Sequence, residues 1–95
     1  VLPEIKREVS DKVTVIVDSG FRRGSDILKG LALGADAVII GRATLYGVAA
    51  GGEAGAVRAL EILRAEIQRT MGVMGLTSLN EITRGHVVTP HEYPL

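Results

Sequence analysis

The sequence has no cysteine and no tryptophan, only one phenylalanine and two tyrosines, and no excess of either charge. Without cysteine, disulfide bonds, thiolate catalysis and cysteine-ligated metals are excluded. Eleven Lys+Arg are balanced by eleven Asp+Glu, which excludes a strongly basic surface, so we expect no nucleic-acid partner. No apolar run approaches the roughly 18–20 residues needed to cross a membrane.

The length and the start of the chain point to a segment of a larger fold. The 95 residues suffice for one small domain, whereas a complete parallel β/α barrel needs about 200–250 residues. The core must be built from small aliphatic side chains, because aromatic residues are only 3% of the chain. The N-terminus, Val1-Leu2-Pro3-Glu4, matches neither a signal peptide nor a start methionine. We therefore expect this chain to pack against further protein.

Apolar periodicity predicts two strand–helix units in the first half of the chain. The expected elements are a helix over 3–9, a strand over 13–17, a helix from about 24 to 33, and a strand over 37–40. Gly24 or Ser25 is the expected N-cap of the second helix, and Gly34 suits its left-handed end. β-branched strands separated by one helix are typical of a parallel βαβ unit.

Glycines divide the second half of the chain. A short helix is predicted over 43–50, ended by Gly51-Gly52, and a long one over 53–74, closed by Gly75. A further short helix is expected over 77–82, with Thr77 or Ser78 as its cap. The residues from 84 onward carry two prolines and are typical of a surface arm.

Both predicted strands end in sequences that suit a phosphate group. The first ends Asp18-Ser19-Gly20-Phe21-Arg22, and the second ends Gly41-Arg42. Ligands of parallel α/β proteins lie at the carboxyl ends of strands, where glycine lets backbone N–H groups approach closely. Arginine adds a fixed cation whose donors fit phosphate oxygens. Each piece alone is typical of an ordinary turn, but the combination favours a phosphate cradle.

Three side chains near this cradle leave alternatives open. Asp18 would repel phosphate, unless it contacts the hydroxyls of an attached polyol or accepts backbone N–H bonds that fix its own loop. Because Arg22 and Arg23 are adjacent, we expect one at most to face the anion and the other to form a salt bridge or subunit contact.

The spacing of His86 and His91 fits no common metal motif, so we predict no metal site.

The stretch from Val15 to Ala35, followed by Val38-Ile39-Ile40-Gly41-Arg42, resembles the C-terminal part of the FMN-dependent 2-hydroxy acid dehydrogenases and oxidases. This family includes glycolate oxidase, lactate oxidase, flavocytochrome b2 and (S)-mandelate dehydrogenase, and residues 43–55 are most similar to the mandelate dehydrogenase branch. The resemblance covers residues 1–88 and leaves 89–95 as a tail. It implies an α/β fold: the last two strands, with their helices, of a (β/α)8 TIM barrel.

The resemblance also implies FMN as the cofactor and assigns its contacts. Asp18 would bond the ribityl hydroxyls, the first phosphate loop would be Ser19, Gly20, Phe21 and Arg22, and the second would be Gly41 and Arg42. Ser19 stands where the family usually has glycine, and its side chain fits if φ is negative there. The family's catalytic histidine and arginine belong to a Ser-Asn-His-Gly-Gly-Arg type motif, which is absent here. No catalytic residue is therefore assigned.

The function implied is that of an oxidoreductase segment acting on a small 2-hydroxy acid, mandelate-like or glycolate/lactate-like, to give the 2-keto acid. The expected partners are the remainder of the barrel, as upstream residues or a separate chain, and further copies in a homotetramer. The expected location is the cytoplasm or the periphery of the inner membrane. Two alternatives stay open: another FMN or phosphate barrel (IMP dehydrogenase-like or isopentenyl-diphosphate isomerase-like), and a non-enzymatic quarter-barrel module. The former does not predict the helix start at Gly52-Glu53-Ala54-Gly55.

Overall fold

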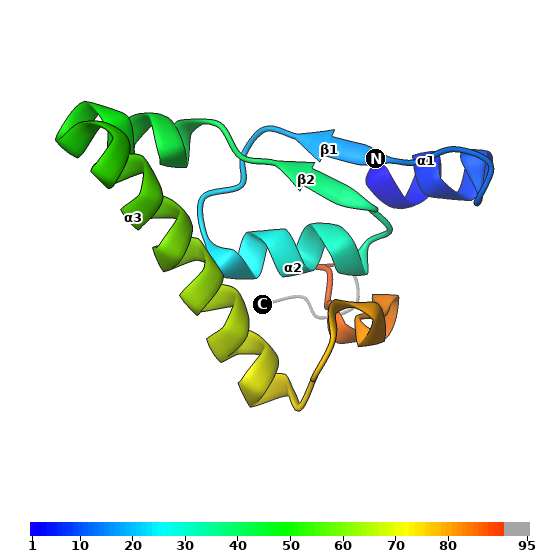
Figure 1. Cartoon of the computed structure of the whole chain (residues 1–95). Helices are drawn as coiled ribbons and strands as arrows, with labels where there is room; N and C mark the ends of the chain where they lie inside the picture. Colours follow the sequence, from blue (N-terminus) through cyan, green and yellow to red (C-terminus); the bar gives the residue numbers. More distant parts are fainter. Residues whose placement is uncertain (91–95) are drawn as a thin grey trace.

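The computed structural model describes residues 1–90 and forms a small α/β unit around two parallel strands (Figure 1). In chain order the elements are α1 Leu2–Val9, β1 Ile16–Asp18, α2 Gly24–Ala32, β2 Ala37–Ile39, α3 Arg42–Met74, and the 3₁₀ turns η1 Leu79–Glu81 and η2 Arg84–His86. Ile16 lies opposite Ala37 and Asp18 opposite Ile39 in the parallel ladder. The predicted βαβ unit is therefore confirmed.

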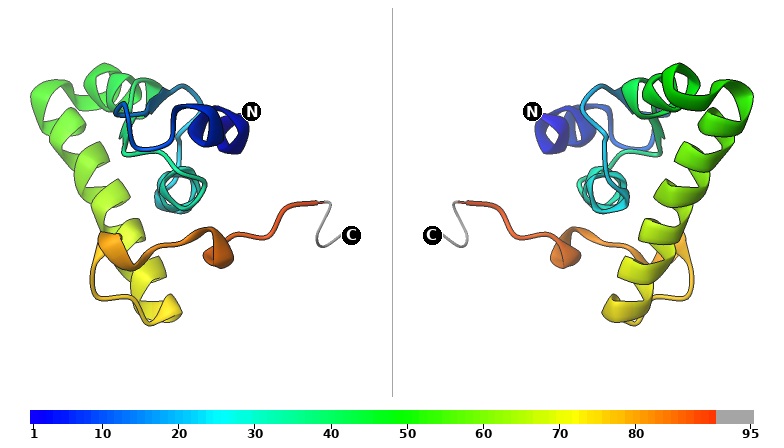
Figure 2. Two further views of the ribbon diagram at one scale, coloured as in Figure 1. Left: turned by 90° about the vertical axis from the view of Figure 1, so that its right-hand side faces the viewer. Right: turned by 90° about the vertical axis from the view of Figure 1, so that its left-hand side faces the viewer.

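Helix α2 is the centre of the packing. Its apolar stripe supplies Ile27, Leu28 and Ala32, which are buried, as are Ala35 and Leu63. Figure 2 shows α2 end-on between the strand layer and the 3₁₀ turns, with α3 along one side of the molecule. The small-aliphatic core expected from the scarcity of aromatic residues is present, and it is limited in extent.

The strands have one covered and one open face. Val17 and Val38 are half-buried, and Val38 lies against α2 beside Gly30. Side chains alternate along a strand, so Ile16 and Ile39 face the other way, and they are 56% and 49% exposed. Neither strand has a second neighbour in the described part of the chain. An apolar face with two unpaired edges is typical of a sheet that continues in further protein.

Helix α3 consists of two limbs that cross closely. Gly51 (φ −154°) and Gly52 (φ 62°) leave helical geometry between them, which confirms the predicted glycine break. The limbs approach at Gly47 and Gly55: a Cβ on Gly47 would lie 2.8 Å from the Gly55 carbonyl carbon, and a Cβ on Gly55 would meet the Gly47 carbonyl oxygen. Only glycine permits this approach.

The structure differs from the sequence prediction at the first strand. β1 covers 16–18 instead of 13–17, because β2 offers only three residues for pairing. Val15 bonds Asp36 instead: its N–H donates to Asp36 Oδ2 at 2.8 Å, and its carbonyl accepts from the Asp36 N–H at 2.8 Å. Val13, at the start of the predicted strand, lies outside β1 and is 53% exposed.

Residues 76–90 contain more secondary structure than was predicted from the sequence. Ser78 caps η1, its Oγ accepting from the Asn80 N–H at 3.2 Å, as expected for one of the two candidate caps. Residues 84–86 form η2, which packs against α2 and was not predicted. The predicted tail, 89–95, lies mostly outside the described residues. Within residues 1–90, no helix combines the length and apolarity needed to cross a membrane.

Candidate functional site

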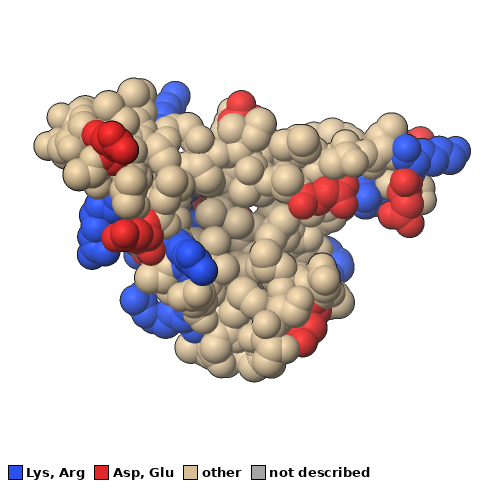
Figure 3. Space-filling view, viewed as in Figure 1, with Lys and Arg blue, Asp and Glu red and all other residues tan. Residues whose placement is uncertain are grey.

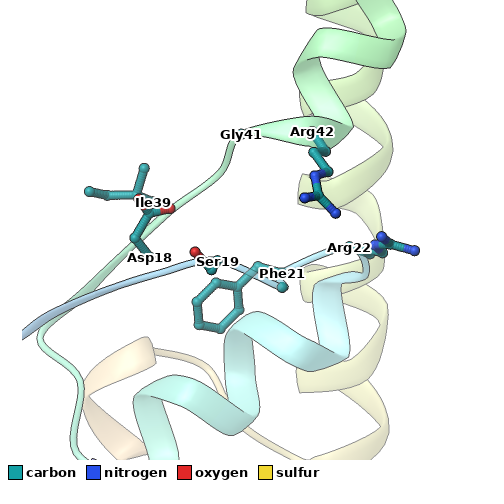
Figure 4. Close-up of a pocket in the computed structure, with 8 residues that line it drawn as sticks. Asp18, Ser19, Phe21, Arg22, Ile39, Gly41 and Arg42 are labelled. Atoms are coloured by element: carbon teal, nitrogen blue, oxygen red, sulfur yellow. The ribbon is translucent and has the colours of Figure 1, made fainter.

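A pocket of about 260 Å³ lies at the carboxyl ends of β1 and β2. Its lining residues are Asp18, Ser19, Gly20, Phe21, Arg22, Ile39, Gly41 and Arg42 (Figure 4). All seven residues singled out in the sequence thus meet at one cavity. Ile39 was missed, although the parallel register that places it opposite Asp18 is the signal that could have found it.

The two arginines of the pocket are oriented differently. Figure 4 shows the Arg42 side chain extending from the start of α3 toward the first loop, while the Arg22 guanidinium points away from Ser19 and Phe21. Both side chains are exposed. Arg42 is therefore the cation placed directly over the space between the loops.

The helix N-termini that follow the two strands are also different. At α2, the N–H groups of Arg22 and Arg23 donate to Asp26 Oδ2 at 3.2 and 3.0 Å, and the Gly24 N–H donates to Glu66 Oε1 at 2.8 Å. At α3 the N-cap is Gly41, which has no side chain to cap the first-turn N–H groups. The open, partially positive helix end beside the pocket is therefore that of α3.

Arg23 lies outside the pocket and joins α2 to α3. Its Nε and a terminal nitrogen lie 2.9 and 2.7 Å from Glu66 Oε2. This hydrogen bond raises the pKa of Arg23, and together with the bond from the Gly24 N–H it lowers the pKa of Glu66. The expected division of roles between the adjacent arginines is confirmed for Arg23. The expected N-cap is wrong: α2 is capped at Arg23, whose backbone is extended (φ −127°, ψ 156°), and Gly24 is already the first helical residue.

Glu66 makes the attachment of α2 to α3 dependent on pH. Because its pKa is lowered in the folded state, its contribution is present above the ordinary glutamate pKa of about 4.3 and is lost as the pH falls through the lowered value. In a complete barrel that contains this chain, we expect Glu66→Gln to lower the unfolding midpoint at neutral pH, and the difference from the parent barrel to shrink on acidification. Unfolding followed by circular dichroism across this range tests the prediction. Glu8→Gln, at an exposed position of α1, is the control. A difference in unfolding midpoint between Glu66→Gln and the parent that stays constant with pH would contradict the prediction.

The first loop adopts an unexpected backbone conformation. Ser19 has φ 86° and Gly20 has φ 88°, so the negative φ that would let a side chain fit without strain at Ser19 is not present. Among the described residues no group hydrogen-bonds the Asp18 carboxylate, and Asp26 fixes the loop instead. The alternative in which Asp18 accepts its own loop's N–H groups is therefore contradicted. The Asp18 carboxylate lines the cavity and is available to a ligand.

The described histidine, His86, belongs to no group of metal-ligating side chains within residues 1–90. The Nδ1 atom of His86 accepts from the Thr83 N–H at 2.9 Å, and His91 lies outside the described residues. No group of three metal-ligating side chains occurs within residues 1–90. Figure 3 shows basic and acidic side chains interspersed around a largely uncharged face, without a single-sign patch.

The described pocket suits a phosphate monoester that carries hydroxyl groups. A Cβ at Gly20 or at Gly41 would meet no atom within 4 Å, so a ligand can approach the backbone at both loops. Arg42 and the start of α3 supply positive charge and N–H donors. Asp18 supplies an acceptor for hydroxyls on the β1 side. This donor and acceptor set fits the ribityl phosphate of FMN.

Sequence comparisons give relatives along nearly the whole chain. Glycolate oxidase 2 of Oryza sativa subsp. indica is 56% identical over 88 residues, which are 93% of this chain and 24% of the relative. A peroxisomal (S)-2-hydroxyacid oxidase of Arabidopsis thaliana is 45% identical over 92 residues, 97% of this chain and 25% of the relative. The chain thus spans about a quarter of the length of the curated relatives it matches.

Structural comparison gives the same result. A soluble mutant of the membrane-associated (S)-mandelate dehydrogenase from Pseudomonas putida superposes with TM-score 0.81 at 44% identity, covering 97% of this chain and 24% of that one. The flavin-binding domain of baker's yeast flavocytochrome b2 gives TM-score 0.81 at 43% identity, covering 90% and 23%. The FMN-dependent dehydrogenase family model matches residues 1–89, which include both loops of the pocket. With two parallel strands that deliver these loops to one cavity, the chain belongs to the FMN-dependent dehydrogenase family.

Proposed function

We propose that this chain holds the phosphate and ribityl end of FMN in an enzyme that oxidises a small 2-hydroxy acid. The observation that carries the proposal is the single cavity lined by both strand-end loops. Arg42, with the first N–H groups of α3, would bind the phosphate, and Gly20 and Gly41 would let it approach the backbone. Asp18 would accept hydrogen bonds from ribityl hydroxyls, and Arg22 would add a second cation at the edge.

Bound FMN would supply the acceptor for the two electrons removed when the 2-hydroxy acid becomes the 2-keto acid. The residues of this chain would orient that acceptor. They take no proton from the substrate, because the histidine and arginine motif that the family resemblance implies does not occur in this sequence. The proposed division of labour therefore places cofactor binding here and substrate chemistry in the remainder of the protein.

The remainder would complete a (β/α)8 barrel, in which β1 and β2 are the last two strands. The exposed Ile16 and Ile39 support this, because they form the face that a barrel interior would bury. A homotetramer, as well as a location in the cytoplasm or at the inner-membrane periphery, is a proposal from the family resemblance alone. Relatives carry the names of glycolate and 2-hydroxyacid oxidases, so we propose a small aliphatic or mandelate-like 2-hydroxy acid as substrate.

A chimera tests the proposed function. In it, this chain replaces the matching 88-residue segment of the rice glycolate oxidase 2. We expect the chimera to purify with bound FMN, whose visible absorbance bleaches when glycolate is added without oxygen. The chain alone is expected to show no cooperative unfolding and little FMN binding, because its strand face is uncovered. A folded chimera without flavin would contradict the proposed role in FMN binding. A cooperatively folded chain that retains FMN by itself would contradict the proposal that the remainder of a barrel completes the fold.

A further inference from the structure

Ser19 gives the pocket a side chain at a position where the family resemblance implies glycine. It follows the last residue of β1, lines the cavity and has φ 86°. A side chain in this region of backbone conformation is disfavoured, and glycine adopts it without that penalty. Serine here therefore has a conformational cost, while its neighbour Gly20, at φ 88°, has none.

The Ser19 hydroxyl faces the space between the two loops. Figure 4 shows the hydroxyl oxygen on the side of the first loop that faces Gly41 and the start of α3, not on the side of the Phe21 ring. Among the described residues it has no hydrogen-bond partner. A serine hydroxyl can donate one hydrogen bond and accept others. Beside a dianion it would donate.

We propose that the Ser19 hydroxyl donates a hydrogen bond to an oxygen of the FMN phosphate, and that Ser19 is thus a positioning residue of the cofactor pocket. This inference rests on the proposed function, since it requires the phosphate to lie between the loops. Ser19 lies on the strand side of the space between the loops, and Arg42 lies on the helix side. The Ser19 hydroxyl and the Arg42 guanidinium would together fix the position of the phosphate, and Arg42 would also neutralise part of its negative charge.

Paired flavin titrations of the apo chimera test this proposal. Serine and alanine both carry a Cβ at the same strained φ, so Ser19→Ala isolates the hydroxyl. We expect it to weaken FMN binding about tenfold, the value of one hydrogen bond to a charged group. Riboflavin, which lacks the phosphate, should bind within about twofold of the parent. Ser19→Gly, which removes both hydroxyl and strain, should give the same loss for FMN.

Ser10→Ala is the matched control, because Ser10 also has a positive φ (52°) and lies at the end of α1, outside the pocket lining. It should leave both flavin affinities unchanged. If Ser19→Ala or Ser19→Gly binds FMN as tightly as the parent, the hydroxyl has no such role. If Arg42→Ala also leaves the preference for FMN over riboflavin unchanged, the phosphate pocket itself is wrong. If Arg42→Ala weakens FMN binding and the Ser19 variants do not, the proposed role of Ser19 is wrong and the phosphate pocket stands.

Discussion

Arg42→Ala should weaken the binding of FMN to the apo chimera by about thirtyfold, equivalent to about 2 kcal/mol for hydrogen bonds to a charged group. Three features of α3 account for this size. Arg42 is its first residue, its side chain extends into the space between the loops, and the N-cap Gly41 leaves the first-turn N–H groups without a side-chain partner. Removing the guanidinium leaves the phosphate with helix-end donors but no directly placed cation.

Fluorescence titration with FMN and riboflavin provides the measurement for Arg42→Ala. Riboflavin affinity should change little, because riboflavin has no phosphate group for the guanidinium to bind. Arg58→Ala is the control of equal charge change: Arg58 is exposed, pairs with Glu61 within α3 and lies outside the pocket lining, so FMN affinity should be retained. Arg22→Ala should give a smaller loss than Arg42→Ala, since its guanidinium points outward. Equal losses from Arg58→Ala and Arg42→Ala would show a general effect of net charge instead.

The fold was largely predictable because local signals specify it. Glycines with positive φ end α2 at Gly34 and α3 at Gly75, and a glycine pair breaks α3, all where the sequence placed them. The apolar stripe of α2 predicted its buried side. The extent of β1 was not predictable from Val13–Val17 alone, because strand ends depend on what the partner strand offers for pairing.

The pocket was predictable to the extent that strand ends meet at one edge of a parallel sheet. Its supporting contacts were of two kinds. Asp26 lies three residues after Arg23, the spacing at which an acidic side chain reaches back to a helix N-cap, and this signal could have been used. Glu66 lies 42 residues from Gly24, and no local pattern indicates that contact. The positive φ of Ser19 could not be predicted from the sequence either, because serine residues seldom have a positive φ.

The conformation of the phosphate loop depends on how closely α2 approaches α3, and Gly24 sets that approach. Gly24 is buried, and a Cβ there would lie 2.6 Å from Glu66 Cβ and 2.7 Å from the Ile67 backbone nitrogen. Neither atom can move without moving α3. We expect Gly24→Ala to lower the stability of the chimera by about 1–3 kcal/mol, the range for overpacking a close contact. It should also weaken FMN binding, since the first loop leads directly into α2.

Gly72→Ala is the control for Gly24→Ala, because Gly72 also lies in a helix but a Cβ there meets nothing within 4 Å. Alanine in an exposed helix is favoured over glycine by about 1 kcal/mol, so this variant should be neutral or stabilised. Urea unfolding of the three proteins, followed by circular dichroism, gives the comparison. A Gly24→Ala protein as stable as the parent would mean that α2 and α3 can separate at little cost. The bonds from Arg23 and Gly24 to Glu66 would then not hold the loop in place.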